Sequence, residues 1–398
     1  MKPLLSIQDA EKAILENLTI ADAEYVPLEQ ASFRVLRENL VADRDAPPFD
    51  RVMMDGIAIH SSEFTGIGSH FTLAGTQAAG SKALVKTEPQ TCFEVMTGAP
   101  LPEGCDCVIP VEEISITETS VILSPDADVE AGKFIHPTGS DSQQGSMVLA
   151  KNSLLSSAEL AIAASMGYAN LSVSRIPRIT ILTSGDEVVS PEKTPEPFQI
   201  RSSHPSAILS MIHRQHLGIC RHIHLPDAVS VSRAAMETAM ETSDFIILTG
   251  GVSKGKFDFI APTLSELVGP PIFHGVKQRP GKPLGYWKTP TSPHIFALPG
   301  NPVSVMATAT RYVLPALKSY LGIPQAGLTR PLAEPFHWTA PLPGFVPVKI
   351  TSNGAALPSP VRNSGDFLSL AGCTGFIECK PNSPHLALGA PQPYFPFL

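Results

Sequence analysis

The segment LTGGVSKGKFD, residues 248–258, carries residue types that suit the binding of phosphate and metal ions. It leaves an apolar strand and then contains Gly250, Gly251, Ser253, Gly255 and Asp258. Glycines let the backbone turn sharply and bring bare N–H groups close to a ligand, and such groups suit phosphate. A carboxylate a few residues later suits a metal ion that bridges to the phosphate. The alternative is that this loop is only a tight strand–helix turn.

Two further loops leave apolar strands through glycine in the same way, namely TSGDE (183–187) and LPGNP (298–302). The first adds the acids Asp186 and Glu187, and the second contains Pro299, Gly300 and Pro302. A fourth loop, RPGKPL (279–284), has Arg279, Gly281 and Lys282 beside prolines that stiffen it, and we interpret it as an anion clamp. Glycine-rich backbone with clustered carboxylates is what a site needs to hold a phosphorylated ligand through Mg²⁺.

The elements that carry these loops alternate between apolar strands and amphipathic helices from residue 177 to about 322. This rhythm predicts a parallel sheet that is covered by helices on both faces. Ligands bind beyond the carboxyl ends of the strands in such sheets, so we expect the three strand-terminal loops to lie together.

The rest of the chain has a different pattern on each side of this region. We predict a multidomain α/β plus β fold, in which a central doubly wound parallel αβ sheet is joined by an inserted β-rich domain, a helical segment and a small C-terminal β domain. Ser6 is expected to cap a first helix, and Ser156 with Glu159 has capping-box spacing. The predicted domains are residues 1–45 with 139–176 (helical linking domain), 46–138 (inserted β-rich), 177–322 (αβ) and 323–398 (C-terminal β).

Composition excludes several classes of protein. The formal net charge of −8 argues against a general nucleic-acid binder, which needs a basic surface. No apolar run approaches the length of a bilayer span, and the N-terminus has no signal-peptide pattern, so we expect a cytoplasmic protein without membrane contact. The six cysteines show no zinc-type spacing and are expected to be reduced. The spacing of four histidines, His213, His216, His222 and His224, resembles that of a metal site. Because they have no acidic or cysteine partners in the sequence pattern, we interpret them as structural.

Six segments, in chain order, together resemble the molybdopterin molybdenumtransferase family of the MoeA and gephyrin E-domain type. They are PPFDRVMMDGIAI, VMTGAPLPEGCDCVIPVEE, TSGDEVV, GGVSKGKFD, RPGKPL and LPGNPVS. The resemblance implies an enzyme that joins molybdate to the dithiolene of adenylylated molybdopterin and releases AMP in a Mg²⁺-dependent step. It also implies a homodimer of four-domain subunits, with hand-over contacts to molybdopterin adenylyltransferase or to apo-molybdoenzymes.

The resemblance also implies roles for individual residues. The family's functional positions fall on Asp55, Thr97, Asp141, Glu187, Asp227 and Asp258. Glu187 and Asp258 are assigned to the metal and phosphate, and Asp55 and Thr97 to the neighbourhood of molybdate or the adenylate. The glycine loops and the RPGKPL loop would bind the pterin and its pyrophosphate.

The chain departs from the family pattern at two places. Ile57 stands where the family usually has tyrosine, and IRSSH (200–204) replaces an IYDSN-like stretch, so that Ser202 and His204 stand at the usual acid and amide. Two other functions compete with the transferase. A molybdopterin adenylyltransferase would resemble residues 177–322 alone, and a non-catalytic scaffold related to the gephyrin E domain would have no use for the site acids.

Overall fold

A computed structural model describes residues 3–66, 68–226, 228–250 and 260–397 of the chain. The chain forms two compact units, and each is described by itself. The larger unit comprises residues 1–25, 33–35 and 172–398, and the smaller unit comprises residues 26–32 and 36–171. Among the described residues, no helix combines the length and the apolar character needed to cross a membrane.

The centre of the larger unit is a six-stranded sheet with the order β16-β13-β17-β20-β19-β18. Four neighbouring strands are parallel, namely β13 (Arg178–Ser184), β16 (Ile219–Leu225), β17 (Phe245–Thr249) and β20 (His294–Leu298). The remaining two, β19 (Gly285–Trp287) and β18 (Phe273–His274), are antiparallel. The parallel sheet predicted from the strand–helix rhythm is confirmed, with an antiparallel edge added to it.

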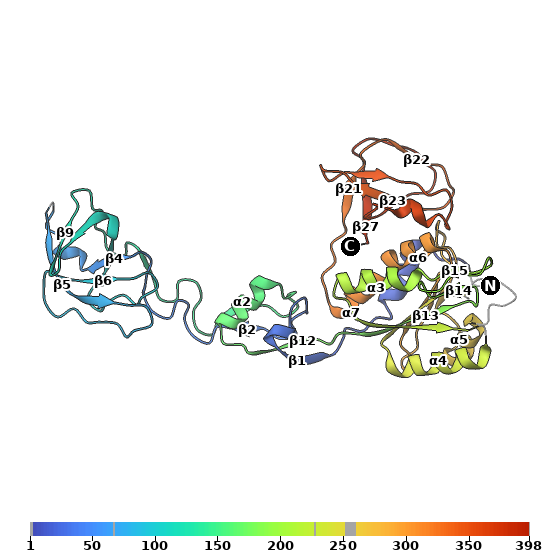
Figure 1. Cartoon of the computed structure of the whole chain (residues 1–398), viewed down its shortest axis with the longest axis horizontal. Coiled ribbons are helices and arrows are strands. Elements are labelled where there is room, and N and C mark those ends of the chain that lie inside the picture. The colour runs from blue at the N-terminus through green and yellow to red at the C-terminus, as the bar shows by residue number, and fades with distance from the viewer. Residues whose placement is uncertain (1–2, 67, 227, 251–259, 398) are drawn as a thin grey trace. The chain divides into compact units, whose positions relative to one another are not determined.

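Helices cover both faces of this sheet (Figure 1). Alternate residues of β17 point to opposite sides: Phe245 and Ile247 join one hydrophobic core, and Ile246 and Leu248 join another. The first core is shared with α1 (Ile7–Leu15), α3 (His204–Arg214), α6 (Pro302–Thr308), the π-helix η4 (Ala309–Val313) and α7 (Leu314–Leu321). The second core is shared with α4 (Val229–Thr242) and α5 (Ile260–Val268). Burial on both faces explains why the central strands β17 and β20 consist mainly of apolar residues.

The N-terminal helix is shorter than the helical pattern predicted for residues 1–45. It begins after Ser6, which caps it as expected, and ends at Leu15. Strand β1 (Ala23–Pro27), the 3-10 turn η1 (Leu28–Gln30) and strand β2 (Leu40–Val41) follow it. The helical prediction for residues 16–45 is therefore wrong, because backbone pairing of β1 with β12 and of β2 with β11 outweighs local helix propensity. The capping box of Ser156 and Glu159 is present at the start of α2 (Ser157–Ser165), between β11 (Met147–Leu149) and β12 (Asn170–Ser174).

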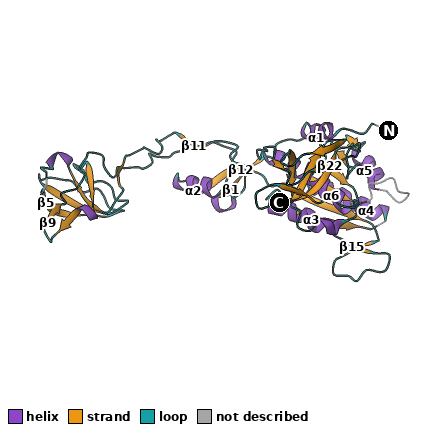
Figure 2. Ribbon diagram, turned by 90° about the horizontal axis from the view of Figure 1, so that it is seen from above, coloured by secondary structure: helices purple, strands orange, loops and turns teal. Residues whose placement is uncertain are grey.

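The smaller unit contains a six-stranded sheet with the order β7-β4-β6-β5-β9-β8. Figure 2 labels two of its strands, β5 and β9. Its strands are β4 (Gly56–Ile59), β5 (His70–Gln77), β6 (Thr91–Val95), β7 (Cys107–Pro110), β8 (Ile114–Ile116) and β9 (Ser120–Leu123). The short strands β3 (Arg51–Val52) and β10 (Ile135–His136) pair beside it, and the 3-10 turns are η2 (Ser61–Glu63) and η3 (Val111–Glu113). This region has the β-rich character expected for residues 46–138.

The C-terminal part of the larger unit is also built from strands. A five-stranded sheet has the order β21-β27-β25-β23-β24, and β22 pairs with β26. The bounds are β21 (Thr329–Pro331), β22 (Phe336–Trp338), β23 (Gly344–Ile350), β24 (Ala356–Pro358), η5 (Phe367–Leu370), β25 (Gly375–Cys379), β26 (Ser383–Leu386) and β27 (Pro391–Pro396). The short strands β14 (Val188–Val189) and β15 (Ile200–Arg201) pair near the αβ sheet.

Candidate functional site

The three strand-terminal loops meet at one edge of the αβ sheet. Strands β13, β17 and β20 are parallel neighbours, so their carboxyl ends lie together. A Cβ atom added to Gly250 would lie 3.0 Å from the backbone oxygen of Ser184, and one added to Gly300 would lie 3.7 Å from the Cα of Gly250. Gly250 also has a φ of +83°, which favours glycine. The predicted gathering of these loops is confirmed for the described residues.

Glu187 places a carboxylate beside this junction. Gly185 has a φ of +117°, and a Cβ atom there would lie 2.4 Å from Glu187 Oε2. The carboxylate therefore folds back over the glycine that follows β13, and the residue is exposed. An exposed carboxylate at the end of a parallel strand can serve as an oxygen ligand to Mg²⁺.

His204 also reaches the sheet edge from the first turn of α3. Its Nδ1 lies 3.2 Å from Thr249 Oγ1, directly before Gly250. Burial lowers the pKa of His204. This histidine, one of the departures from the family pattern, therefore lies next to the glycine loop.

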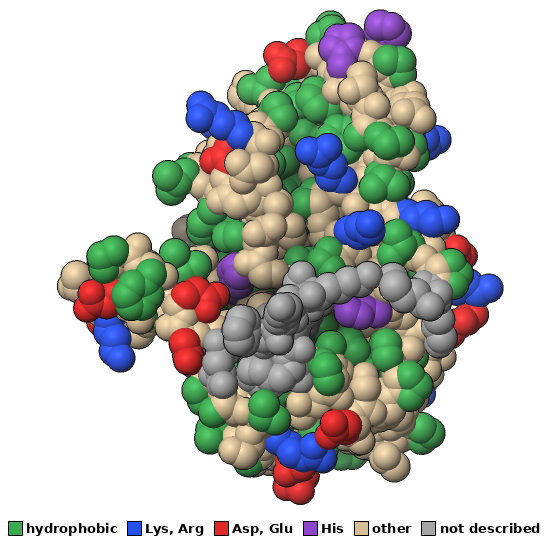
Figure 3. All heavy atoms as spheres, turned by 90° about the vertical axis from the view of Figure 1, so that its right-hand side faces the viewer, with side chains coloured by type: hydrophobic (Ala, Val, Ile, Leu, Met, Phe, Trp, Pro, Cys, Tyr) green, Lys and Arg blue, Asp and Glu red, His purple; other side chains and the backbone are tan. Residues whose placement is uncertain are grey.

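A cavity of about 760 Å³ opens beside the LPGNP loop and the RPGKPL loop. We call it the cationic cavity. It is lined by residues 278–283, 336–340, 342, 345–347 and 360–364, together with Pro299, Asn301 and Ser304. Arg279, Lys282 and Arg362 supply its positive charges, and none of its lining residues in the described part of the chain is an aspartate or glutamate. All three cations are exposed, so their charges are open to a ligand. Figure 3 shows a group of Lys and Arg side chains on one face of the larger unit.

Buried side chains hold the RPGKPL loop in its shape. Gln278 Nε2 donates to the backbone oxygen of Gly281 at 2.9 Å, and the buried Tyr312 hydroxyl donates to Gln278 Oε1 at 2.5 Å. Gly281 has a φ of +91°, and a Cβ atom there would lie 2.5 Å from Thr308 Cγ2. Glycine is therefore required, and the backbone between Arg279 and Lys282 is held in place before any ligand binds.

The LPGNP loop is tied to the C-terminal part of the unit. Asn301 Nδ2 donates to Ser364 Oγ at 2.8 Å, and the Val303 amide donates to the Ser364 backbone oxygen at 3.1 Å. Pro302 begins α6, where its missing N–H costs little. Ser364 and Arg362 were not predicted from the sequence. They lie in a proline-rich tail without a local motif, and only tertiary packing brings them to the cavity.

Asp55 and Thr97 form a pair in the smaller unit. The Thr97 amide and hydroxyl donate to Asp55 Oδ1 at 2.7 and 2.8 Å, across a separation of 42 residues. The Thr97 backbone hydrogen bond, and then its hydroxyl, lower the pKa of the exposed Asp55 carboxyl. A Cβ atom at the adjacent Gly56 would lie 1.9 Å from the Ile109 oxygen, so this turn requires glycine.

Asp141 is held by a histidine, which in turn is held by an arginine of the same unit. Its Oδ1 lies 2.8 Å from His136 Nε2, and His136 Nδ1 lies 2.9 Å from Arg51 Nη2. Arginine can only donate, so Nδ1 accepts and the Nε2–H donates to Asp141. Arg51 and His136 are directly paired residues of β3 and β10, which explains why they meet.

The site residues predicted from the sequence therefore fall into two sets. Glu187 and the residues of the glycine and RPGKPL loops belong to the larger unit, and Asp55, Thr97 and Asp141 belong to the smaller unit. Gly251, Ser253, Gly255, Asp227 and Asp258 lie outside the described residues. Three of the four histidines predicted to be structural have protein partners: His222 and His224 lie 2.9 and 3.0 Å from Thr183 Oγ1. His216 stacks on Phe33 with ring centroids 4.2 Å apart.

Comparison with known proteins covers nearly the whole chain. A family model described as "MoeA N-terminal region (domain I and II)" matches residues 5–167, and one described as "Probable molybdopterin binding domain" matches residues 180–319. The chain is 36% identical to the molybdopterin molybdenumtransferase of Synechocystis sp. over 367 residues, which is 91% of this chain and 92% of that protein. It is 32% identical to that of Synechococcus elongatus, covering 92% and 93%.

A solved structure extends this similarity to the fold. The molybdopterin biosynthesis MoeA protein from Pyrococcus horikoshii OT3 superposes with a TM-score of 0.81 at 26% identity, covering 98% of this chain and 99% of that one. Sequence and fold therefore agree over both units.

Proposed function

We propose that this chain, which belongs to the molybdopterin molybdenumtransferase family, joins molybdate to the dithiolene of adenylylated molybdopterin and releases AMP and molybdenum cofactor in a Mg²⁺-dependent reaction. One observation carries this proposal: a cationic cavity with no acid among its described lining residues lies beside glycine loops at the carboxyl edge of a parallel sheet. Such an edge suits a nucleotide-like ligand, and exposed cations suit its phosphates.

The cavity would bind the substrate through two kinds of contact. Arg279, Lys282 and Arg362 would bind phosphate or oxyanion oxygens, because their side chains are exposed and none of the described residues that line the cavity is acidic. Phe336, Trp338 and Phe345 line the same space and offer apolar surface to a flat pterin ring. Its volume of about 760 Å³ lies within the range typical of small-molecule sites.

Glu187 fits the metal that the family implies. Its exposed carboxylate lies over Gly185 at the phosphate-binding edge, and Mg²⁺ prefers one or two carboxylates together with substrate phosphates. The ion would supply positive charge to the pyrophosphate. Asp258, outside the described residues, is proposed as the second ligand on the basis of the resemblance.

The smaller unit would contribute acids that act on molybdate or the adenylate. Asp55 is kept ionised by Thr97, and Asp141 is oriented by His136. We further propose that the protein works as a cytoplasmic homodimer that passes its product to apo-molybdoenzymes. Sedimentation equilibrium would measure its oligomeric state.

One assay separates this function from its two rivals. The purified protein is incubated with adenylylated molybdopterin, molybdate and MgCl₂, and AMP is measured by chromatography. A transferase releases AMP only when molybdate and substrate are both present. An adenylyltransferase would consume ATP and molybdopterin, although the match over residues 5–167 already disfavours it. A protein that does neither would be a scaffold, and the proposal would then be wrong.

A further inference from the structure

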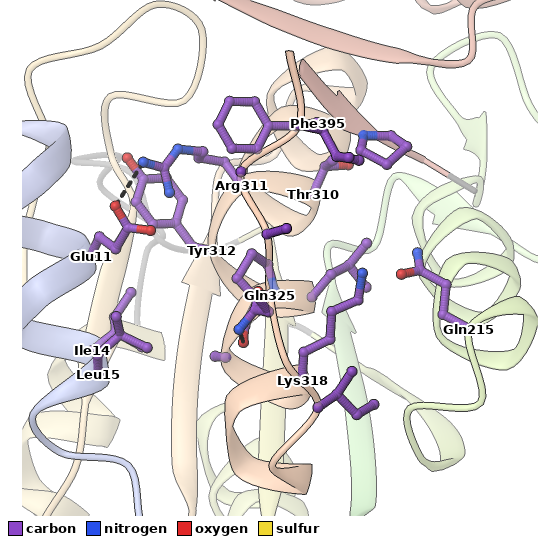
Figure 4. Close-up of a pocket in the computed structure, with 18 of the residues that line it drawn as sticks. Glu11, Ile14, Leu15, Gln215, Thr310, Arg311, Tyr312, Lys318, Gln325 and Phe395 are labelled. Atoms are coloured by element: carbon purple, nitrogen blue, oxygen red, sulfur yellow. Dashed lines mark hydrogen bonds and ion pairs between the residues drawn. The ribbon is translucent and has the colours of Figure 1, made fainter. Parts of the chain in front are cut away.

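A second cavity, of about 490 Å³, lies in the larger unit and takes no part in the proposed reaction. We call it the second cavity; α1, the end of α3, η4, α7 and the segments 323–328 and 394–396 line it (Figure 4). Its size falls within the range of pockets that bind small molecules. The chemistry of its two ends differs.

The charges at one end of the second cavity are already satisfied within the protein. Arg311 is buried, and its guanidinium lies 2.9 Å from Glu11 Oε2 and 3.2 Å from Glu378 Oε2. The same guanidinium lies 4.8 Å from the ring centroid of Phe395. The charge of Arg311 is therefore compensated by two carboxylates of the protein, and an anionic ligand gains little there.

The other end carries two polar groups that have no partner among the described residues. Within the described part of the chain, the side chains of Lys318 and Gln215 make no hydrogen bond or ion pair, and Gln215 Nε2 is fully buried. Figure 4 shows both side chains pointing toward the same part of the cavity, away from the Glu11–Arg311 pair. Burial lowers the pKa of Lys318, since its ammonium is partly desolvated without a counter-ion. A buried donor without an acceptor costs about 1–3 kcal/mol, so an acceptor that enters from outside would be stabilised.

The walls between these ends are mainly apolar. Ile14, Leu314 and Ile323 line the cavity. The amide of Gln325 is committed to the protein, because its Nε2 donates to the Pro315 oxygen at 3.0 Å and to Ser319 Oγ at 2.7 Å. A ligand that fits this space has one anionic end and an apolar body.

We propose that the second cavity binds a small monocarboxylate with an apolar body, whose carboxylate accepts hydrogen bonds from Lys318 and Gln215. A phosphate dianion fits less well, because one ammonium and one amide cannot compensate its charge, whereas the cationic cavity offers three cations. A neutral ligand leaves the ammonium without a counter-ion. This inference does not depend on the proposed transferase function.

Three probes test the inference by isothermal titration calorimetry on the full-length protein. Sodium benzoate has the expected carboxylate and apolar body, benzyl alcohol keeps the body without the charge, and inorganic phosphate keeps charge without the body. Benzoate should bind with a saturable isotherm, and benzyl alcohol should bind at least about tenfold more weakly. Phosphate is expected to bind in the cationic cavity, which offers three cations, and so it should not displace benzoate. Absence of benzoate saturation at about 10 mM, which corresponds to negligible affinity, would overturn the proposal.

Two variants place the bound probe in this cavity. Lys318→Met keeps the aliphatic stem and removes the ammonium, and it should weaken benzoate binding about tenfold or more. Lys318→Gln provides a second test if the methionine variant melts early. Lys282→Met, in the cationic cavity, is the matched control and should leave benzoate affinity unchanged. Equal affinity in wild type and both Lys318 variants, or loss only in the control, would show that the site lies elsewhere.

Discussion

The cationic cavity and the second cavity each hold arginine and lysine side chains, but they use these charges differently. Arg279 and Lys282 are exposed, and no described acidic residue lines their cavity. Arg311 is buried between Glu11 and Glu378, and it joins α1 and β25 to the π-helix that carries it. The charge of Arg311 is compensated by two glutamates of the protein, whereas the charges of Arg279 and Lys282 are exposed and can bind a ligand.

This difference gives a criterion for separating binding cations from structural ones. A cation matched by carboxylates from distant parts of the chain stabilises the fold, because its removal leaves buried acids unpaired. A cation can instead lie on a loop whose backbone is fixed by other residues, without a carboxylate close to it. Such a cation slightly lowers the stability of the free protein, because it is repelled by neighbouring cations. We expect such a cation to be compensated by an anionic substrate.

The strongest test of the comparison removes both loop cations of the cationic cavity. The double variant Arg279→Met/Lys282→Met should lower kcat/KM for AMP release by about 10³-fold, because two charge-assisted contacts are lost. Its melting temperature should stay close to that of wild type, since both side chains are exposed. Measured rates within a few-fold of wild type would remove these residues from the substrate site.

The complementary variant removes the structural cation. Arg311→Met should lower the free energy of unfolding by about 3 kcal/mol, because Glu11 and Glu378 lose their partner and Glu378 is largely buried. Urea denaturation measures this loss. Adding Glu378→Gln should restore part of the stability, and failure of that second change to help would contradict the unpaired-acid explanation.

The glutamates of the larger unit differ in the same way as its cations. Glu187 folds over Gly185 and is exposed, unlike the glutamates that pair with Arg311. Glu187→Gln should reduce turnover about 100-fold at low MgCl₂, because a ligand of the ion loses its charge. Titration with MgCl₂ should recover part of the rate. A variant whose rate and Mg²⁺ dependence both match wild type would exclude Glu187 as a metal ligand.

The smallest expected effect concerns a carboxylate held by hydrogen bonds instead of a cation. Thr97 favours the ionised form of Asp55, so its contribution is present above the usual pKa of 3.8 and is lost as the pH falls through the lowered value. Thr97→Val removes the hydroxyl donor but keeps the backbone donor, so it should raise the pKa of Asp55 part of the way toward 3.8, as measured by carboxyl NMR titration. Thr97→Ser, which retains both donors, should keep the low pKa. Identical titration curves in all three proteins would exclude a contribution of the Thr97 hydroxyl to the lowered pKa of Asp55.

Short-range patterns in the sequence predicted a large part of this molecule. The alternation of apolar strands and helices indicated the doubly wound sheet, and parallel strands necessarily bring the Ser184, Gly250 and Gly300 loops to one edge. The caps at Ser6 and Ser156 were also predicted, because a cap needs only residues within one helical turn. Local chemistry was sufficient in each case.

The same local reasoning was wrong after Leu15, where helix-forming residues instead continue into strands. The pairing of β1 and β2 with β12 and β11 depends on segments more than a hundred residues away. A propensity difference of a few tenths of a kcal/mol per residue cannot compete with such pairing and burial.

The sequence by itself determined the types of site residue and the loops that carry them. Only the tertiary structure decided that Thr97 binds Asp55, that Tyr312 and Gln278 support Gly281, and that Arg362 joins Arg279 and Lys282. These contacts join segments that have no common motif. A local sequence pattern predicts contacts between residues that are a few positions apart. Contacts between distant segments form only when the packed cores bring their loops together.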